Sequence, residues 1–191
     1  MSLAKLRCTQ EYKLGEETII HLSYTQPDPS LMVLIASYSS GQTQRFEYLH
    51  PDAAKALKKM ISAARDDRIW IVPISAFRSL ERQKKLFEKA ITRRGSEEQA
   101  ARFSAPPSFS EHHTGYAVDL GDGHSPNLDF STDFSKTPAF IWLNQHATDF
   151  GFEMSFPPDN SQGISYEPWH WRYIESQEAN EVFSKAQNLE K

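Results

Sequence analysis

The chain contains very little cysteine, because Cys8 is the single thiol among its 191 residues. An intramolecular disulfide is therefore excluded, and so are metal sites built from four thiolates. Any metal that the protein binds must be held by imidazole and carboxylate groups, a ligand set that suits zinc. Seven histidines are available for that purpose.

Long apolar runs and an excess of positive charge are also missing. The longest apolar run, Leu31 to Ala36, is far shorter than the about 20 residues that a membrane-spanning helix needs. Residues 1–7 have no continuous apolar stretch, so no signal peptide is expected in this chain, and the cytoplasm stays open as a compartment. The formal net charge of -4 leaves no basic footprint for nucleic acid. We therefore expect a soluble chain with no nucleic-acid partner and no membrane span, and the composition does not indicate an oligomeric state.

Apolar residues make up 39% of the chain, enough to fill a sizeable core, and we find no repeat, low-complexity tract or Gly/Ser linker. Residues 1–191 are therefore expected to form one domain. Within it, residues 1–45 are rich in β-forming segments and form an extension of unclear role. Strands are expected at 18–24, 31–38 and 45–49, with a hairpin loop at 39–42.

From Pro51 onward, helical and strand periodicities alternate. Apolar residues recur at helical spacing after Pro51, whereas 69–75 is a short β-branched run typical of a buried strand. Further helices are expected at 80–91, 96–103, 137–150 and 176–188, and further strands at 115–120 and 169–174. This mixture predicts an α+β fold.

Two segments carry residues suited to metal chemistry. Residues 110–119 fit the pattern S-x-H-x-x-G-x-A-x-D, in which His112 and Asp119 lie seven apart (119 − 112). Residues 167–173 fit E-x-x-H followed by aromatic strand residues, with Glu167 three positions before His170 (170 − 167). Together the segments offer two imidazoles and one carboxylate to a metal, with a second carboxylate nearby.

These residue types belong together in a hydrolytic zinc site. A catalytic zinc ion typically has three protein ligands and keeps a position for water, whose pKa it lowers to about 7. Glu167 can accept the proton of that water and pass it to the leaving amine. Arg78, at a predicted strand-to-helix junction, can stabilise an oxyanion or hold a substrate carboxylate.

The two motifs, together with residues 75–79 and Gln83, resemble the VanY-like and LdcB-like zinc D-alanyl-D-alanine carboxypeptidases, which share their type of zinc site with hedgehog and lysostaphin. The resemblance spans about residues 49–174 and implies an α+β fold whose central antiparallel sheet bears the zinc site and is flanked by helices. It implies a periplasmic or cell-wall protein that acts on peptidoglycan stem peptides.

The resemblance also implies a role for each matching residue. One zinc ion would be bound by His112, Asp119 and His170. Glu167 would be the general base and Arg78 the electrostatic stabiliser. The substrate pocket would be lined by Gln83, Ser110 and Trp169.

Ordinary structural roles compete with some of these assignments. His113 is a rival ligand to His112, but neighbours in an extended segment point to opposite faces, so only one of them can face a metal shared with Asp119. Asp122 and His124 lie between glycines and are better explained by turn formation. Arg78 could instead cap a helix or pair with an acid.

The sequence thus favours a zinc carboxypeptidase that removes the C-terminal D-amino acid from stem peptides. One alternative is a cell-wall endopeptidase, such as a phage-type endolysin, with the same zinc centre. Another is a zinc-containing binding module without catalysis, which the presence of Glu167 and Arg78 argues against. The sequence does not distinguish a D,D-bond from an L,D-bond.

Overall fold

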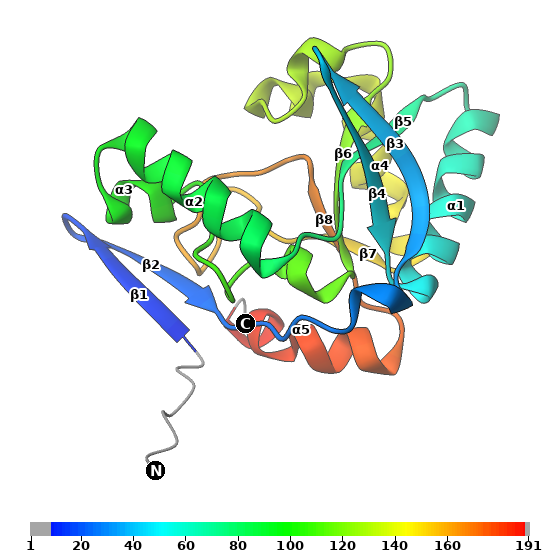
Figure 1. Ribbon diagram of the computed structural model, residues 1–191. Coiled ribbons are helices and arrows are strands. Elements are labelled where there is room, and N and C mark those ends of the chain that lie inside the picture. The colour runs from blue at the N-terminus through cyan, green and yellow to red at the C-terminus, as the bar shows by residue number, and fades with distance from the viewer. Residues whose placement is uncertain (1–8, 190–191) are drawn as a thin grey trace.

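The computed structural model describes residues 9–189, in which short strands and helices are mixed along the chain (Figure 1). The α+β prediction is confirmed. The helices are α1 (Pro51–Asp66), α2 (Leu80–Arg94), α3 (Glu97–Ala101), α4 (Pro138–His146) and α5 (Gln177–Leu189). The strands are β1 (Thr9–Leu14), β2 (Glu17–Leu22), β3 (Val33–Ser40), β4 (Thr43–Leu49), β5 (Ile71–Ser75), β6 (Ala117–Asp122), β7 (Phe152–Met154) and β8 (His170–Tyr173).

The central sheet has four strands in the order β5-β6-β8-β7, and every neighbouring pair is antiparallel. The predicted central antiparallel sheet is therefore confirmed. Its register pairs Ser75 with Asp119 and Asp119 with His170. Directly paired residues of neighbouring strands point to the same face of a sheet. One row of the sheet thus brings together side chains from three distant parts of the chain.

The opposite face of the sheet carries the main core. Alternate strand residues such as Val118, Leu120 and Trp171 pack with the apolar stripe of α1 and with α4. Figure 1 shows α1 and α4 on one side of this sheet, and α2 and α3 on the other. The face that bears Asp119 therefore points toward α2 and toward the loops that precede β6 and β8.

Two separate hairpins form in the N-terminal part of the chain. The predicted β3–β4 hairpin is present, with its turn at Gly41 and Gln42. The second hairpin contains β1, which was not predicted, paired with β2. Tyr12 and Ile19 of this hairpin form a small apolar cluster with residues of α2 and α3. The hairpin is therefore held beside the helices that lie next to the metal-bearing face.

Capping residues set the start of several helices. The hydroxyls of Ser79, Ser96 and Thr137 each accept a backbone N–H in the first turn of a helix. The helix predicted over 137–150 is divided, because α4 ends at His146 and a 3₁₀ turn continues to Phe150. The short strand β7 follows at once and was not predicted.

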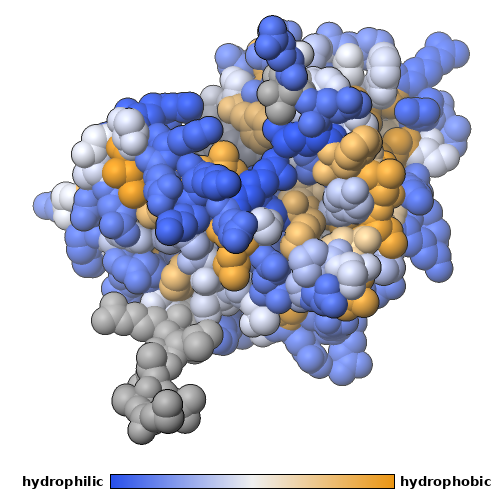
Figure 2. Space-filling model, viewed as in Figure 1, coloured by the Kyte–Doolittle hydropathy of each residue, from blue (hydrophilic) through white to orange (hydrophobic). Residues whose placement is uncertain are grey.

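Within residues 9–189, no helix combines the length and the apolar character required to cross a bilayer. Apolar side chains do gather on the surface over the β3–β4 hairpin, as Figure 2 shows. The exposed members of this patch are Leu31, Val33, Leu34, Phe46 and Tyr48. None of them lines the cavity described below.

Candidate metal centre

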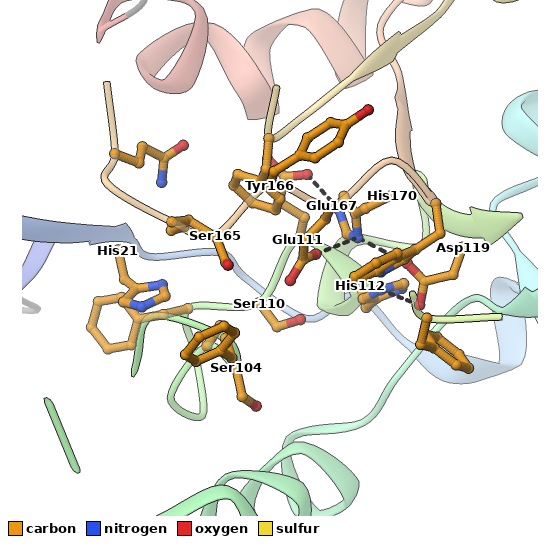
Figure 3. Close-up of a pocket in the computed structure, with 18 of the residues that line it drawn as sticks. His21, Ser104, Ser110, Glu111, His112, Asp119, Ser165, Tyr166, Glu167 and His170 are labelled. Carbon is orange, nitrogen blue, oxygen red and sulfur yellow. Dashed lines mark hydrogen bonds and ion pairs between the residues drawn. The ribbon is translucent and has the colours of Figure 1, made fainter. Parts of the chain in front are cut away.

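Three buried side chains converge on one point at the metal-bearing face of the central sheet. One donor atom each from His112, Asp119 and His170 lies within 4.8 Å of the other two. Asp119 and His170 come from paired positions of β6 and β8, whereas His112 comes from the turn before β6. Figure 3 shows the three side chains pointing toward one another.

Each imidazole contacts a different oxygen of the Asp119 carboxylate. His112 Nε2 lies 3.2 Å from Asp119 Oδ2, and His170 Nδ1 lies 3.0 Å from Asp119 Oδ1. Two ligand atoms bound to one tetrahedral zinc ion are about 3.3 Å apart, given metal–ligand distances of about 2.0–2.2 Å. Two imidazoles and one carboxylate in this arrangement fit a zinc ion that keeps a position open.

His112 is displayed by a 3₁₀ turn, Glu111–Thr114, and the expectation of an extended segment here is wrong. The turn is closed by the Thr114 hydroxyl, which donates to the Glu111 carbonyl and accepts the N–H of Tyr116. Gly115 ends it with φ +75°, and a Cβ there would lie 2.5 Å from Met32 Sδ. Glycine is therefore favoured at the point where the chain passes from the turn into β6.

His113 points away from the metal site and has a structural role. Its Nδ1 donates to the Arg78 carbonyl at 2.6 Å, and its Nε2 accepts the N–H of Ser108 at 3.2 Å. The ring is fully buried. His113 thus ties the turn that carries His112 to the strand-to-helix junction that carries Arg78.

The protonation states of the three ligands follow from burial and from their mutual contacts. Burial, reinforced by the nearby Arg78 guanidinium, lowers the pKa of His112 to about 4, so its ring is neutral at pH 7. Burial alone would raise the pKa of Asp119, but the two imidazoles hold it far below its usual range. Burial opposes protonation of His170, yet hydrogen bonds to Asp119 and Glu111 raise its pKa to about 10. Metal binding at His170 Nδ1 would therefore release a proton.

Glu167 lies at the edge of the same centre. Its Oε2 is 3.9 Å from His170 Nδ1, and its side chain is 14% exposed. Burial raises the pKa of Glu167 to about 7, and the nearby Asp119 carboxylate adds to this shift. The positive charges of His170 and Arg78 oppose it. A carboxyl group with that pKa can both accept and release a proton near neutral pH.

Arg78 lies in the loop between β5 and α2, two residues before the helix begins. Its Nη2 donates to Ser75 Oγ at 3.0 Å, and its Nη1 donates to Gln83 Oε1 at 2.9 Å. The guanidinium also lies 3.5 Å from the Asp119 carboxylate. Gln83, which the resemblance placed in the substrate pocket, is not among the residues that line the cavity described below. Its side chain is fully buried behind Arg78, where its amide donates to the Ala105 carbonyl.

A cavity of about 490 Å³ opens over the metal centre. Ser110 and Trp169 line it, together with Arg78 and Glu167. Residues from the N-terminal segment also line it, which the sequence did not indicate: these are His21 and Tyr24. The remaining side chains include an aromatic and basic group, Phe103, Arg93 and Arg94.

Glu111 is a buried residue of this site whose role the motifs do not indicate. It immediately precedes His112, and its side chain is 3% exposed. Its Oε2 lies 2.9 Å from Nε2 of His170, the other histidine of the centre. Its position inside the S-x-H motif was the available signal, but the x of that pattern says nothing of where the side chain points.

Asp122 and His124 lie outside the metal cluster, which confirms that turn formation explains them better. Asp122 Oδ1 accepts the N–H of His124 at 2.8 Å, and Oδ2 accepts the N–H of Ala139 at 3.2 Å. His124 itself is exposed.

Comparison with known proteins extends the similarity over most of the chain. A profile of the VanY family, described as D-alanyl-D-alanine carboxypeptidase, matches residues 46–176. The protein YodJ of Bacillus subtilis (strain 168) is 30% identical over 179 residues, 90% of this chain and 64% of that protein. The D-alanyl-D-alanine carboxypeptidase of Enterococcus faecalis (strain ATCC 700802 / V583) is 30% identical over 146 residues, 70% of this chain. The chain spans only 51% of the length of the Enterococcus protein.

Solved structures show the same fold. The LdcB LD-carboxypeptidase, whose structure concerns peptidoglycan recognition, is similar with a TM-score of 0.71 and 26% identity. That similarity covers 95% of this chain and 92% of LdcB. A vancomycin-resistance D,D-pentapeptidase VanY in complex with Zn(II) is similar with a TM-score of 0.61 and 22% identity, over 88% of this chain and 97% of that one.

Proposed function

The chain belongs to the VanY family of D-alanyl-D-alanine carboxypeptidases, and we propose that it is a zinc carboxypeptidase that removes the C-terminal D-amino acid of peptidoglycan stem peptides. The convergence of His112, Asp119 and His170 beside Glu167 carries this proposal. Such a substrate implies that the protein works in the periplasm or at the cell wall.

His112 Nε2, Asp119 and His170 Nδ1 would hold the zinc ion. Once His170 has released its proton, the donors would be two neutral imidazoles and one ionised carboxylate, which zinc prefers in hydrolytic sites. When bound, zinc supplies Lewis-acid polarisation of the scissile carbonyl and of the attacking water. The related VanY pentapeptidase has been solved with Zn(II).

Glu167 would act as the general base. Its pKa of about 7 allows it to take a proton from the attacking water and return it to the departing amine. The loop that carries it is fixed from both sides, because Glu167 N–H donates to the Phe156 carbonyl and its own carbonyl accepts the N–H of His170. The carboxylate is therefore held beside the metal ligands without being one of them.

Arg78 would stabilise negative charge on the substrate, either the oxyanion of the tetrahedral intermediate or a substrate carboxylate. Its hydrogen bonds to Ser75 and Gln83 hold the guanidinium in place before substrate binds. A cation that is oriented in advance does not have to reorganise during the reaction, which is where electrostatic stabilisation has its largest effect.

The size of the cavity is consistent with a peptide substrate, and its charged residues indicate which group of that peptide it would bind. Its volume of about 490 Å³ exceeds what one amino acid requires. The Arg94 guanidinium stacks 3.8 Å from the Phe103 ring, and neither Arg93 nor Arg94 forms an ion pair within residues 9–189. The acidic side chains that line the cavity, Glu111 among them, belong to the metal centre. We propose that the two arginines bind a carboxylate of the stem peptide.

The test is a mass-spectrometric assay of the zinc-loaded protein on purified tetrapeptide and pentapeptide stems. Loss of one terminal D-alanine is the expected result, and the stem that is cleaved would distinguish an L,D-bond from a D,D-bond. Release of larger fragments would instead establish an endopeptidase. Zinc-loaded protein that cleaves no stem would overturn the enzyme proposal in favour of a binding module.

A further inference from the structure

Glu111 contacts His170, although its neighbour in the chain is the other histidine of the centre, His112. Its Oε2 lies 2.9 Å from His170 Nε2, while the Nδ1 of the same ring lies 3.0 Å from Asp119 Oδ1 (Figure 3). Both nitrogens of His170 are therefore occupied by carboxylates, one that would share the metal and one that would not.

The remaining contacts of Glu111 hold its carboxylate firmly. Ser155 Oγ donates to Oε2 at 2.5 Å, and Arg172 Nη1 donates to Oε1 at 2.9 Å. Tyr24 OH donates to Oε1 at 3.3 Å. Arg172 is fully buried, and its Nε donates to Glu153 at 2.7 Å. The half-buried Glu153, Arg172 and Glu111 thus form a row of alternating charges. Glu111, at the end of this row, contacts His170 of the metal centre.

We infer that Glu111 is a positioning residue that presents His170 Nδ1, and not Nε2, to the metal. An imidazole can bind a metal through either nitrogen, and the hydrogen bond that the other nitrogen makes decides which one. A carboxylate that accepts a hydrogen bond from Nε2–H keeps the proton on that nitrogen, so the Nδ1 lone pair is left for the metal. The same hydrogen bond fixes the ring and makes it a more basic ligand. This inference rests on the proposed zinc centre.

A purely structural role would be to neutralise the buried Arg172. The two roles can be tested separately. Arg172 also forms an ion pair with Glu153, whereas the carboxylate that contacts His170 Nε2 is that of Glu111. Glu111→Gln keeps the size of the side chain, but its single carbonyl oxygen can accept from either His170 or Arg172 and not from both. Glu153→Gln is the matched control, because it removes an acid from Arg172 without touching His170.

The experiment measures zinc affinity by competition with a chelator, together with the ¹⁵N chemical shifts of the His170 ring in the zinc-loaded protein. Loss of a histidine's carboxylate partner typically weakens metal binding by about 10–100-fold. We expect Glu111→Gln to show that loss and a changed Nε2–H signal, whereas Glu153→Gln should stay within about threefold of the wild type. If Glu111→Gln does not fold, Glu111→Asp keeps the charge beside Arg172 with a shorter reach, and its zinc affinity should still fall at least threefold.

Wild-type zinc affinity and an unchanged His170 signal in a folded Glu111 variant would overturn this inference alone. An equal loss in Glu153→Gln would also overturn it, because the effect would then come from Arg172. If the wild-type protein bound no zinc, the proposed metal centre would be overturned as well. Measuring the wild type first therefore distinguishes that outcome from a failure of the inference about Glu111.

Discussion

The Arg78 guanidinium, in the loop after β5, lies 3.5 Å from the Asp119 carboxylate of β6. The contact joins the residue proposed to stabilise substrate charge to a proposed metal ligand. Since Ser75, which is paired with Asp119 in the register, also accepts a hydrogen bond from Arg78, the position of the guanidinium is set by the same strands that set the metal site.

Glu167→Gln should lower kcat by about 10²–10⁴-fold, because the variant removes the group that accepts the proton while keeping its size. Zinc content should stay stoichiometric, since Glu167 is outside the ligand cluster. Stem-peptide kinetics and metal analysis measure the two effects. Glu88→Gln, exposed on α2, is the control and should behave as wild type. Turnover at the wild-type rate in Glu167→Gln would refute the assignment of the base.

His112→Ala should abolish stoichiometric zinc binding, because only two protein donors would remain at the centre. His124→Ala removes an exposed histidine that lies outside the cluster and should retain one zinc per chain. Metal analysis of the two purified variants decides the matter. If both kept their zinc, the proposed ligand set would be wrong.

Arg94→Gln should raise KM about 3–10-fold for a stem peptide that bears a free side-chain carboxylate, as expected for the loss of one partly exposed charged hydrogen bond. The KM for the same stem amidated at that position should hardly change. Lys85→Gln, exposed on the same helix and absent from the cavity lining, is the control. An equal rise in KM for both stems in Arg94→Gln would show that the arginine does not select a carboxylate.

His21 should make stability depend on pH. Burial lowers its pKa to about 4, against the weaker opposing effect of its hydrogen bond to the Ala101 carbonyl. Above pH 6.5 the ring is neutral in both the folded and the unfolded states, so protonation of His21 does not reduce the free energy of unfolding. As the pH falls from 6.5 toward 4, the unfolded state binds a proton first, and this residue alone should lower the free energy of unfolding by about 3 kcal/mol.

His21→Gln should therefore show a smaller loss of stability between pH 7 and pH 4.5 than the wild type. Denaturant unfolding in the presence of a chelator measures the difference without a contribution from bound metal. His124→Gln is exposed and should retain the wild-type pH dependence. Parallel curves for His21→Gln and the wild type would show that His21 is protonated as readily in the folded protein as in the unfolded chain.

Local sequence patterns were sufficient for most secondary structure. The apolar stripe after Pro51, the capping serines and the β-branched run before Ser75 each act within a few residues, and each produced the expected element. The strands β1 and β7 were not predicted, because a short strand depends on the partner with which it pairs more than on its own residues.

The sequence by itself determined which side chains could form a metal centre, since the spacings around His112, Asp119 and His170 carry that chemistry along the chain. Tertiary structure alone decided what surrounds them. Cross-strand register placed Asp119 beside His170, and burial raised the pKa of Glu167. A 3₁₀ turn brought Glu111 into contact with a histidine 59 positions away in the chain. The physical reason is that periodicity describes neighbours in the chain, whereas hydrogen bonds and burial depend on which distant segments the fold brings into contact.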